Sequence, residues 1–234
     1  MDMLAIFMFD PMYFIYVGPA ILLALYAQMR VSAAFKRGSA IRPRSGMSGA
    51  ETAQAILEQY GIHDVGIEPV QSFLGDHYDP AKKMLRLSPD VYHGRSLAAM
   101  GIAAHEVGHA LQHAHRYGPL VVRGAIVPLA SVGSNLSFLL ILAGLFIAAL
   151  KPLAIVGLIL FGVVVVFQIV NLPVEFNASR RARAVLIDGG LITPEEDRVV
   201  ADVLNAAALT YVAATITAAL QLLYFASLVL GRRN

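Results

Sequence analysis

The chain has 234 residues, of which 57% are hydrophobic and 15% charged, and its mean hydropathy is +0.64. Soluble domains carry about 25% charged residues, so this composition predicts an integral membrane protein. The 18 basic residues nearly balance the 16 acidic ones, which argues against a nucleic-acid-binding protein, and the chain has no cysteine. Any metal site must therefore be built from histidines and carboxylates.

Four segments are long and apolar enough to cross a bilayer, whose hydrocarbon core takes about 20 helical residues. They are Pro11–Gln28, Gly124–Leu150, Pro152–Val174 and Val203–Leu230, with a hairpin predicted between the second and third. Five basic residues follow the first span, namely Arg30, Lys36, Arg37, Arg42 and Arg44. Because positive charge collects on the cytoplasmic side of a membrane, we expect residues 30–123 and 175–202 to lie in the cytoplasm.

The expected cytoplasmic part begins with a capping box, Ser48-Gly-Ala-Glu51, which predicts a helix over Gly49–Gln59. Strand-like pieces follow at 65–70 and 84–88, joined by a loop that contains residues 76–80. We expect a small sheet. The second piece, Met84–Ser88, has the alternation of either an edge strand that receives a substrate chain or an ordinary core strand.

A helix predicted over residues 97–113 and capped by Ser96 carries the most informative motif, His105-Glu106-x-x-His109. Residues four apart lie on one face of a helix, so both imidazoles can reach one tetrahedral zinc ion, with Glu106 beside it to hold a water molecule. The alternative is an amphipathic helix whose histidines only pack or form hydrogen bonds. The small, uncharged residues around the motif favour the metal site.

A third protein ligand has to come from another segment, and Glu175 is the best candidate. It follows the third span directly and lies on the same predicted side of the membrane as the two histidines. The alternative is an interfacial acid paired with Arg180 or Arg181. If Glu175 fails, Asp76 or Asp202 comes next. His113 is about 12 Å along the helix from His105, too far to bind the same ion, so we expect a structural or supporting role for it.

Four runs of residues carry a family resemblance: His105-Glu-Val-Gly-His109-Ala-Leu-Gln-His113, Gly75-Asp-His-Tyr-Asp-Pro80, Leu87-Ser-Pro and Pro173-Val-Glu175-Phe-Asn-Ala-Ser-Arg-Arg181-Ala. Together they resemble the YugP-like family of bacterial neutral membrane zinc metallopeptidases, over nearly the whole chain. More distantly, the last run is similar to the segment that supplies the third zinc ligand in the HtpX-like and prenyl-protein membrane peptidases. That wider group has Asp where this chain has Ser179, and YugP-like chains often have Asp where it has Asn177.

The resemblance implies a gluzincin-type zinc metalloendopeptidase of the bacterial cytoplasmic (inner) membrane. The distribution of basic residues predicts that its active site lies on the cytoplasmic side. One zinc ion per chain would be held by His105, His109 and Glu175, with Glu106 as general base. Its substrates would be proteins or peptides near the membrane, its other partner the lipid bilayer, and nucleic acid is not expected. The residues that could stabilise the oxyanion or support the ligands are left open among His77, Tyr78, Arg180, Arg181, Tyr211 and His113.

The predicted fold class is a mainly α integral membrane protein with four transmembrane helices and a small zincin-like α+β cytoplasmic part. The predicted segments are a first transmembrane helix (1–29), the cytoplasmic region with the zinc helix (30–123), a transmembrane hairpin (124–174), cytoplasmic helices with the third ligand (175–202), and a fourth transmembrane helix and tail (203–234). Two other functions stay open. One is a catalytically inactive zinc-binding membrane scaffold, and the other is a small transporter with a chance motif, for which the spans offer few polar side chains.

Overall fold

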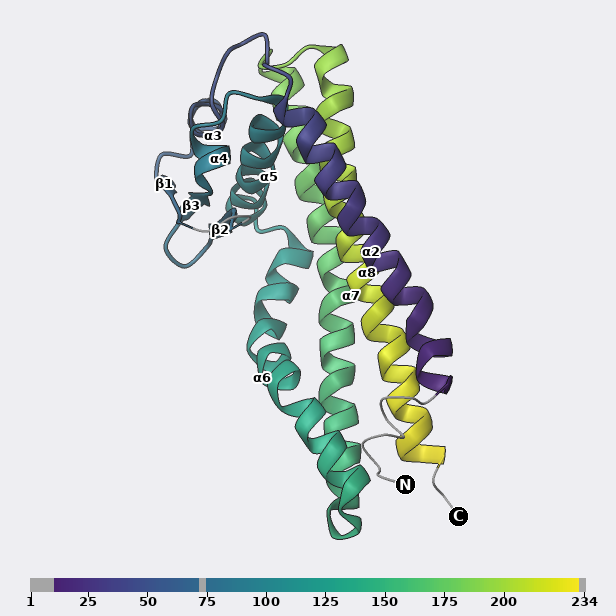
Figure 1. Cartoon of the computed structure of the whole chain (residues 1–234). Coiled ribbons are helices and arrows are strands. Elements are labelled where there is room, and N and C mark those ends of the chain that lie inside the picture. The colour runs from purple at the N-terminus through teal and green to yellow at the C-terminus, as the bar shows by residue number, and fades with distance from the viewer. Residues whose placement is uncertain (1–10, 72–74, 232–234) are drawn as a thin grey trace. The chain divides into compact units, whose positions relative to one another are not determined.

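The computed structural model describes residues 11–71 and 75–231 and is mainly helical (Figure 1). Its long helices are α2 (Pro11–Ser39), α6 (Gly118–Phe146), α7 (Lys151–Asp188) and α8 (Pro194–Gly231), with a short 3-10 turn, η1 (Ala148–Leu150), before α7. All four long helices are long and apolar enough to cross a membrane. The predicted fold class, a mainly α membrane protein with a small α+β part, is confirmed. The outer segments of the predicted division, 1–29 and 203–234, extend over residues 1–10 and 232–234, which lie outside the described residues.

The chain forms two compact units, each described here by itself. The described part of the first unit comprises residues 11–27, 121–172 and 210–231. Within it α6 and α7 pack closely, since a Cβ on Gly157 would lie 2.7 Å from the carbonyl oxygen of Ser137. The core of this unit gathers around Tyr224, whose ring meets Tyr13 edge-on. The unit is therefore held by apolar side chains and close helix contacts, as expected for spans in lipid.

The described part of the second unit comprises residues 28–71, 75–120 and 173–209. It contains α3 (Gly49–Gln59), β1 (Gly66–Pro69), β2 (His77–Asp79), β3 (Met84–Leu87), α4 (Pro89–Tyr92) and α5 (Leu97–Ala114), together with the ends of the long helices. The capping box that opens α3 is confirmed, because Ser48 Oγ accepts from the Glu51 backbone and Glu51 Oε2 accepts from the Ser48 backbone. The predicted cap of α5 by Ser96 is confirmed as well.

The central helix of this unit is α5, which packs against α3, α4 and the sheet. Most of its residues are buried, and Met100, Ala104 and Leu111 belong to one core cluster with Ile56 of α3 and Leu85 of β3. A helix that is apolar on nearly every side is stable only inside a core. The motif helix is therefore a rigid, buried support for the side chains that it carries.

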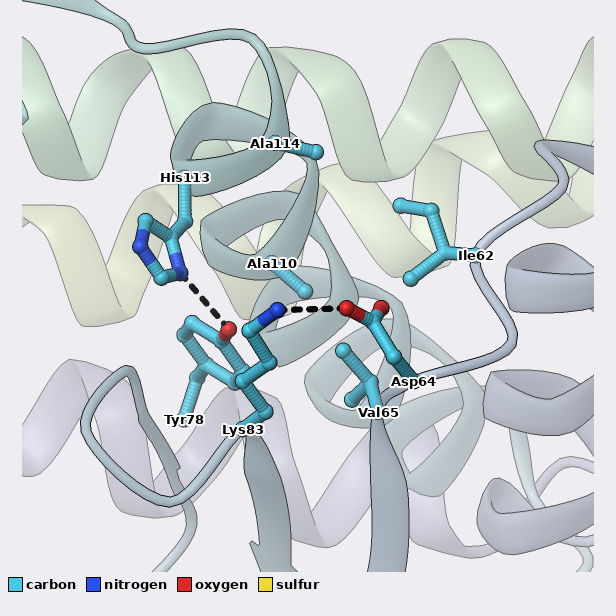
Figure 2. A pocket seen from close by; sticks show the side chains of 8 residues that line it. All are labelled: Ile62, Asp64, Val65, Tyr78, Lys83, Ala110, His113 and Ala114. Carbon is cyan, nitrogen blue, oxygen red and sulfur yellow. Dashed lines mark hydrogen bonds and ion pairs between the residues drawn. The ribbon is translucent and has the colours of Figure 1, made fainter.

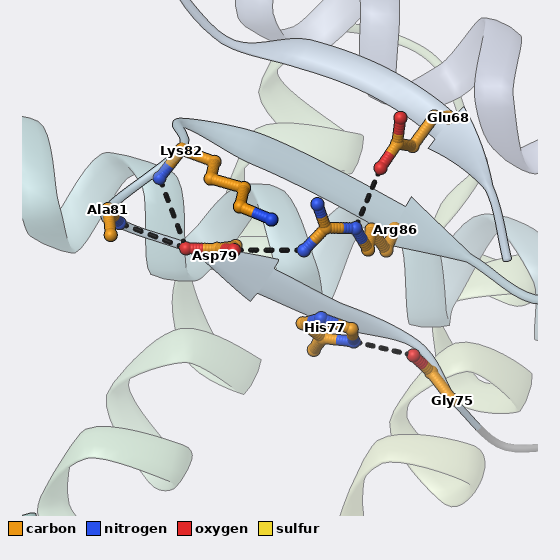
Figure 3. Close-up of polar contacts among 7 residues, drawn as sticks. All are labelled: Glu68, Gly75, His77, Asp79, Ala81, Lys82 and Arg86. Atoms are coloured by element: carbon orange, nitrogen blue, oxygen red, sulfur yellow. Dashed lines mark hydrogen bonds and ion pairs between the residues drawn. The ribbon is translucent and has the colours of Figure 1, made fainter.

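The three strands form a sheet in the order β1-β3-β2, with β1 parallel and β2 antiparallel to β3. Arg86 of β3 joins the strands on one face, because it donates to Glu68 of β1 and to Asp79 of β2 (Figure 3). The Asp79 side chain also accepts from the backbone N–H groups of Ala81 and Lys82. These bonds stabilise the tight turn that leads from β2 into β3.

Two expectations about the sheet need correction. Residues 76–80, expected as part of a loop, contain strand β2, because the turn after Asp79 returns the chain antiparallel to itself. The edge interpretation of Met84–Ser88 is wrong, because β3 is paired on both sides and Leu85 and Leu87 are fully buried. The core alternative for this strand is the one that the structure adopts.

Candidate metal centre

Helix α5 brings His105 and His109 together, with ring centroids 4.8 Å apart and ring planes nearly perpendicular. Both Nε2 atoms face the same carboxylate oxygen of α7, Oε2 of Glu175, at 3.3 Å from His105 and 3.6 Å from His109. One ligand atom from each residue lies within 4.8 Å of the others. Glu175 is only 3% exposed. The structure thus places the three predicted ligands around one point.

The contact between α5 and α7 depends on Gly108, inside the motif. A Cβ at this position would lie 2.7 Å from the carbonyl oxygen of Ala178 on α7. Ordinary side-chain contacts begin at about 3.4 Å, so a larger residue would push the two helices apart. Glu175 lies three residues before Ala178 on the same helix. The glycine therefore sets how closely the carboxylate approaches the histidines.

The distances from the Glu175 oxygen to the two histidine nitrogens match what zinc requires. Ligand atoms about 2.1 Å from a tetrahedral ion lie about 3.4 Å from one another. The 3.3 and 3.6 Å separations between the histidine nitrogens and the Glu175 oxygen agree with this value. Two imidazole nitrogens and one carboxylate are also the donor set of a catalytic zinc site, in which the fourth position is left for water. The residues therefore fit a zinc ion.

Each histidine has a polar partner at its other ring nitrogen. Nδ1 of His105 lies 3.1 Å from the hydroxyl of Ser179, and Nδ1 of His109 lies 3.0 Å from Oε1 of the buried Gln112. Such partners orient metal-binding imidazoles. Ser179 is therefore a polar partner of His105. Sequence reasoning did not single out Gln112, although a polar residue three positions after His109 on a buried helix was the clue.

Glu106 is buried, at 8% exposure, and among the described residues its carboxylate has no hydrogen-bond or ion-pair partner. Burial opposes the charged form of His109, but the carboxylates of Glu175 and Glu106 outweigh this effect, so the pKa of His109 lies above its ordinary value. Glu106 is thus close enough to His109 to act on it electrostatically. A buried carboxylate without a partner is costly, and it is suited to accept a proton from a water molecule.

Tyr78 and His113 lie on one side of a cavity of about 150 Å³ between α5 and the sheet (Figure 2). The Tyr78 hydroxyl is 2.8 Å from His113 Nδ1. Burial, followed by the charges of Asp64 and Asp79, raises the pKa of Tyr78 to about 12. The Tyr78 hydroxyl is therefore neutral at ordinary pH, with His113 as its hydrogen-bond partner.

The other residues proposed from the sequence lie as follows. Arg181 is bonded to Asn177 and His115, and its guanidinium lies over the ring of Tyr117. Arg180 is exposed, and so is His77, whose Nδ1 is bonded to the carbonyl of Gly75 (Figure 3). Tyr211 belongs to the first unit. None of these positions selects an oxyanion donor, and the roles of these residues stay predictions.

Asp76 and Asp202, the two carboxylates considered as alternatives to Glu175, have other hydrogen-bond or ion-pair partners. Both carboxylate oxygens of Asp76 accept hydrogen bonds from Ser88, and burial raises the pKa of Asp76. Asp202 of α8 is paired with Arg30 and Arg37 of α2. Their contacts therefore leave Glu175 as the carboxylate that meets the two histidines.

A buried helix that carries two histidines and a glutamate, with a second carboxylate from another helix beside them, is the arrangement found in zinc-dependent hydrolases. The chain belongs to the family described as "Putative neutral zinc metallopeptidase", whose model matches residues 13–230. It is 45% identical over 224 residues to the "Putative membrane protease YugP" of Bacillus subtilis (strain 168), which covers 95% of this chain and 99% of that protein. The predicted family is confirmed. No solved structure matches the chain.

Proposed function

We propose that this membrane protein hydrolyses peptide bonds of membrane proteins, or of segments close to the membrane, at a zinc site formed by His105, His109 and Glu175. The observation that carries the proposal is the convergence of these three donors beside a buried carboxylate, Glu106, that has no partner among the described residues. A zinc site with only a structural role would be closed by four protein ligands. Three ligands and a nearby base instead favour catalysis.

Each residue has a distinct task in this proposal. Zinc, when bound, supplies a Lewis acid that polarises the peptide carbonyl and makes water more acidic. Glu106 accepts a proton from the attacking water and then delivers it to the nitrogen of the departing peptide. Its burial keeps competing water away and strengthens its interaction with the reacting atoms. Ser179 and Gln112 hold the two imidazoles in place.

The substrate chain has a suitable place along β2. This strand is at the end of the sheet order and packs against α5, and among the described strands it pairs only with β3. An extended peptide can add to such an edge through backbone hydrogen bonds. Because β3 is central, β2 takes the role that the sequence offered to Met84–Ser88. The cytoplasmic side of the inner membrane is the proposed location of the site, on the strength of the basic residues after the first span.

The proposal is tested with full-length protein in detergent, with its zinc content measured by mass spectrometry and its activity measured on labelled casein. Wild-type protein should hold about one zinc ion per chain and lose it, together with casein cleavage, on chelation. Glu106→Gln should retain zinc but lose cleavage, because the base is gone. Glu175→Gln should bind zinc weakly, because one of three ligands is replaced. Glu58→Gln, on the exposed face of α3, is the matched control and should behave as wild type.

The outcomes distinguish the alternatives. Wild-type protein that holds zinc but cleaves nothing would point to the scaffold function, and wild-type protein without zinc would exclude the metal site. Full zinc affinity in Glu175→Gln would show that the third ligand is another residue. Natural substrates are then sought with Glu106→Gln, which should bind them without cleaving them, followed by mass spectrometry of the captured proteins.

A further inference from the structure

Gln112 is a fully buried side chain on α5 that makes three polar contacts at once. Its Oε1 lies 3.0 Å from Nδ1 of His109. Its Nε2 donates to the backbone carbonyl of Val174 at 2.8 Å and to Oδ1 of Asn177 at 3.0 Å. Both amide hydrogens therefore have acceptors on α7, and the amide oxygen is left for the histidine.

The orientation of the Gln112 side-chain amide is determined by Asn177, which is itself oriented by Arg181. Arg181 Nε donates to Asn177 Oδ1 at 2.8 Å, and a guanidinium has no acceptor, so Asn177 must present its oxygen there. The same oxygen faces Gln112, which must then present its NH₂ group. If the Gln112 amide were flipped, its oxygen would face two acceptor oxygens, from Val174 and Asn177. Leaving buried polar groups unsatisfied in this way costs about 1–3 kcal/mol each.

The result is a fixed acceptor beside Nδ1 of His109. Because Gln112 offers an oxygen, it favours a hydrogen on Nδ1. Nε2 of His109 faces a second acceptor, the Glu175 carboxylate, at 3.6 Å. A neutral imidazole has only one N–H, so a hydrogen on Nδ1 leaves the lone pair of Nε2 for a metal ion. Metal binding requires a free lone pair on the coordinating nitrogen. Ser179 does not favour either tautomer of His105, because a hydroxyl can both donate and accept a hydrogen bond.

We propose that Gln112, oriented by Asn177 and Arg181, is a positioning residue that holds His109 in the tautomer required for metal binding. The proposal rests on the proposed function in taking His109 as a zinc ligand. It also assigns a function to Arg181 and Asn177 that differs from oxyanion stabilisation. The three side chains together are called the Gln112 relay.

The first test measures zinc affinity of full-length variants by competition with a chelator. Gln112→Leu removes the acceptor at nearly constant volume and should weaken zinc binding about 10–100-fold, the usual effect of losing such a partner. Asn177→Leu should weaken zinc binding in the same direction, since the Gln112 amide is then oriented by the Val174 carbonyl alone. Asn177→Asp keeps an acceptor for both Gln112 and Arg181 and should lose much less affinity than Asn177→Leu. Thr52→Val removes a buried hydroxyl that is bonded to Ser48, and it controls for a general loss of stability.

The second test reads the tautomer directly in metal-free protein, so it does not depend on zinc binding. Nuclear magnetic resonance of isotope-labelled histidine, at a pH where the imidazole is neutral, distinguishes an N–H at Nδ1 from one at Nε2. The His109 signals are assigned from their absence in His109→Ala. Wild type should carry the hydrogen on Nδ1. Gln112→Leu should shift it toward Nε2, which still faces the Glu175 carboxylate.

Three results would overturn the proposal: a wild-type His109 protonated at Nε2, a Gln112→Leu protein with unchanged tautomer and zinc affinity, or an Asn177→Asp protein as impaired as Asn177→Leu. If the proposed function failed because wild-type protein bound no zinc, the tautomer measurement would still decide whether the relay orients His109. The two failures are therefore distinguishable.

Discussion

Replacing Gly108 by alanine tests whether close packing of α5 on α7 builds the metal centre. The added Cβ would lie 2.7 Å from the Ala178 carbonyl oxygen, about 0.7 Å short of the 3.4 Å at which ordinary contact begins. The contact is with backbone, which cannot rotate away, so the helices must separate. Glu175 is one turn from Ala178 and would move with it. A shift of about 0.5 Å or more exceeds the tolerance of a catalytic site.

Gly108→Ala should lower both the stability of the protein and its zinc affinity. Overpacking a core costs about 1–3 kcal/mol, from which the better helix propensity of alanine, about 1 kcal/mol, is subtracted. Stability should therefore fall only by about 0–2 kcal/mol. The ligand separations, now 3.3 and 3.6 Å, would approach about 4 Å, too wide for tetrahedral zinc. Zinc affinity should drop about 10-fold or more, and casein cleavage about 100-fold.

Gly101→Ala is the matched control on the same helix. Its Cβ would lie 3.1 Å from a methyl group of Val200, which can shift by a few tenths of an ångström. This variant should keep wild-type zinc affinity and gain or lose little stability. Unfolding is followed by circular dichroism and zinc binding by chelator competition. If Gly108→Ala bound zinc and cleaved casein as well as Gly101→Ala, the packing explanation would be refuted.

Two further predictions concern membrane topology and alkaline pH. The chain has no cysteine, so Ser45→Cys and Lys151→Cys, both at exposed positions, can each be labelled singly with a membrane-impermeant maleimide. The cysteine at position 45 should react only from the cytoplasm, and the cysteine at position 151 only from outside. The reverse pattern would place the site on the outer face. Burial and nearby carboxylates raise the pKa of Tyr78 from 10.0 to about 12, so the folded protein holds this proton more tightly than the unfolded one. The free energy of unfolding should therefore fall as the pH rises from about 10 to about 12. Tyr78→Phe should lack this part of the loss, and identical pH profiles for the two proteins would contradict the assignment.

Local features of the molecule were predictable because they depend on residues a few positions apart. Apolar runs predicted the four long helices, and the Ser48 capping box marked the start of α3. The spacing of His105 and His109 sufficed to place both on one face of α5. In each case the pattern acts within one or two helical turns, where backbone geometry allows one arrangement.

Contacts between distant segments needed the tertiary structure. Glu175 was named from its place after the third span, yet its approach to His105, 70 residues earlier, depends on how α5 packs on α7 at Gly108. The metal-binding and catalytic roles of these residues stay predictions.

By itself the sequence determined the family, the membrane-spanning segments and the helix that carries the motif. Only the tertiary structure decided that β3 is the central strand, that Asp76 and Asp202 are engaged elsewhere, and that Gln112 faces His109. The physical reason is that helix caps and apolar periodicity are encoded locally. Strand order and side-chain partners depend instead on which surfaces pack together, and several packings are compatible with the same local pattern.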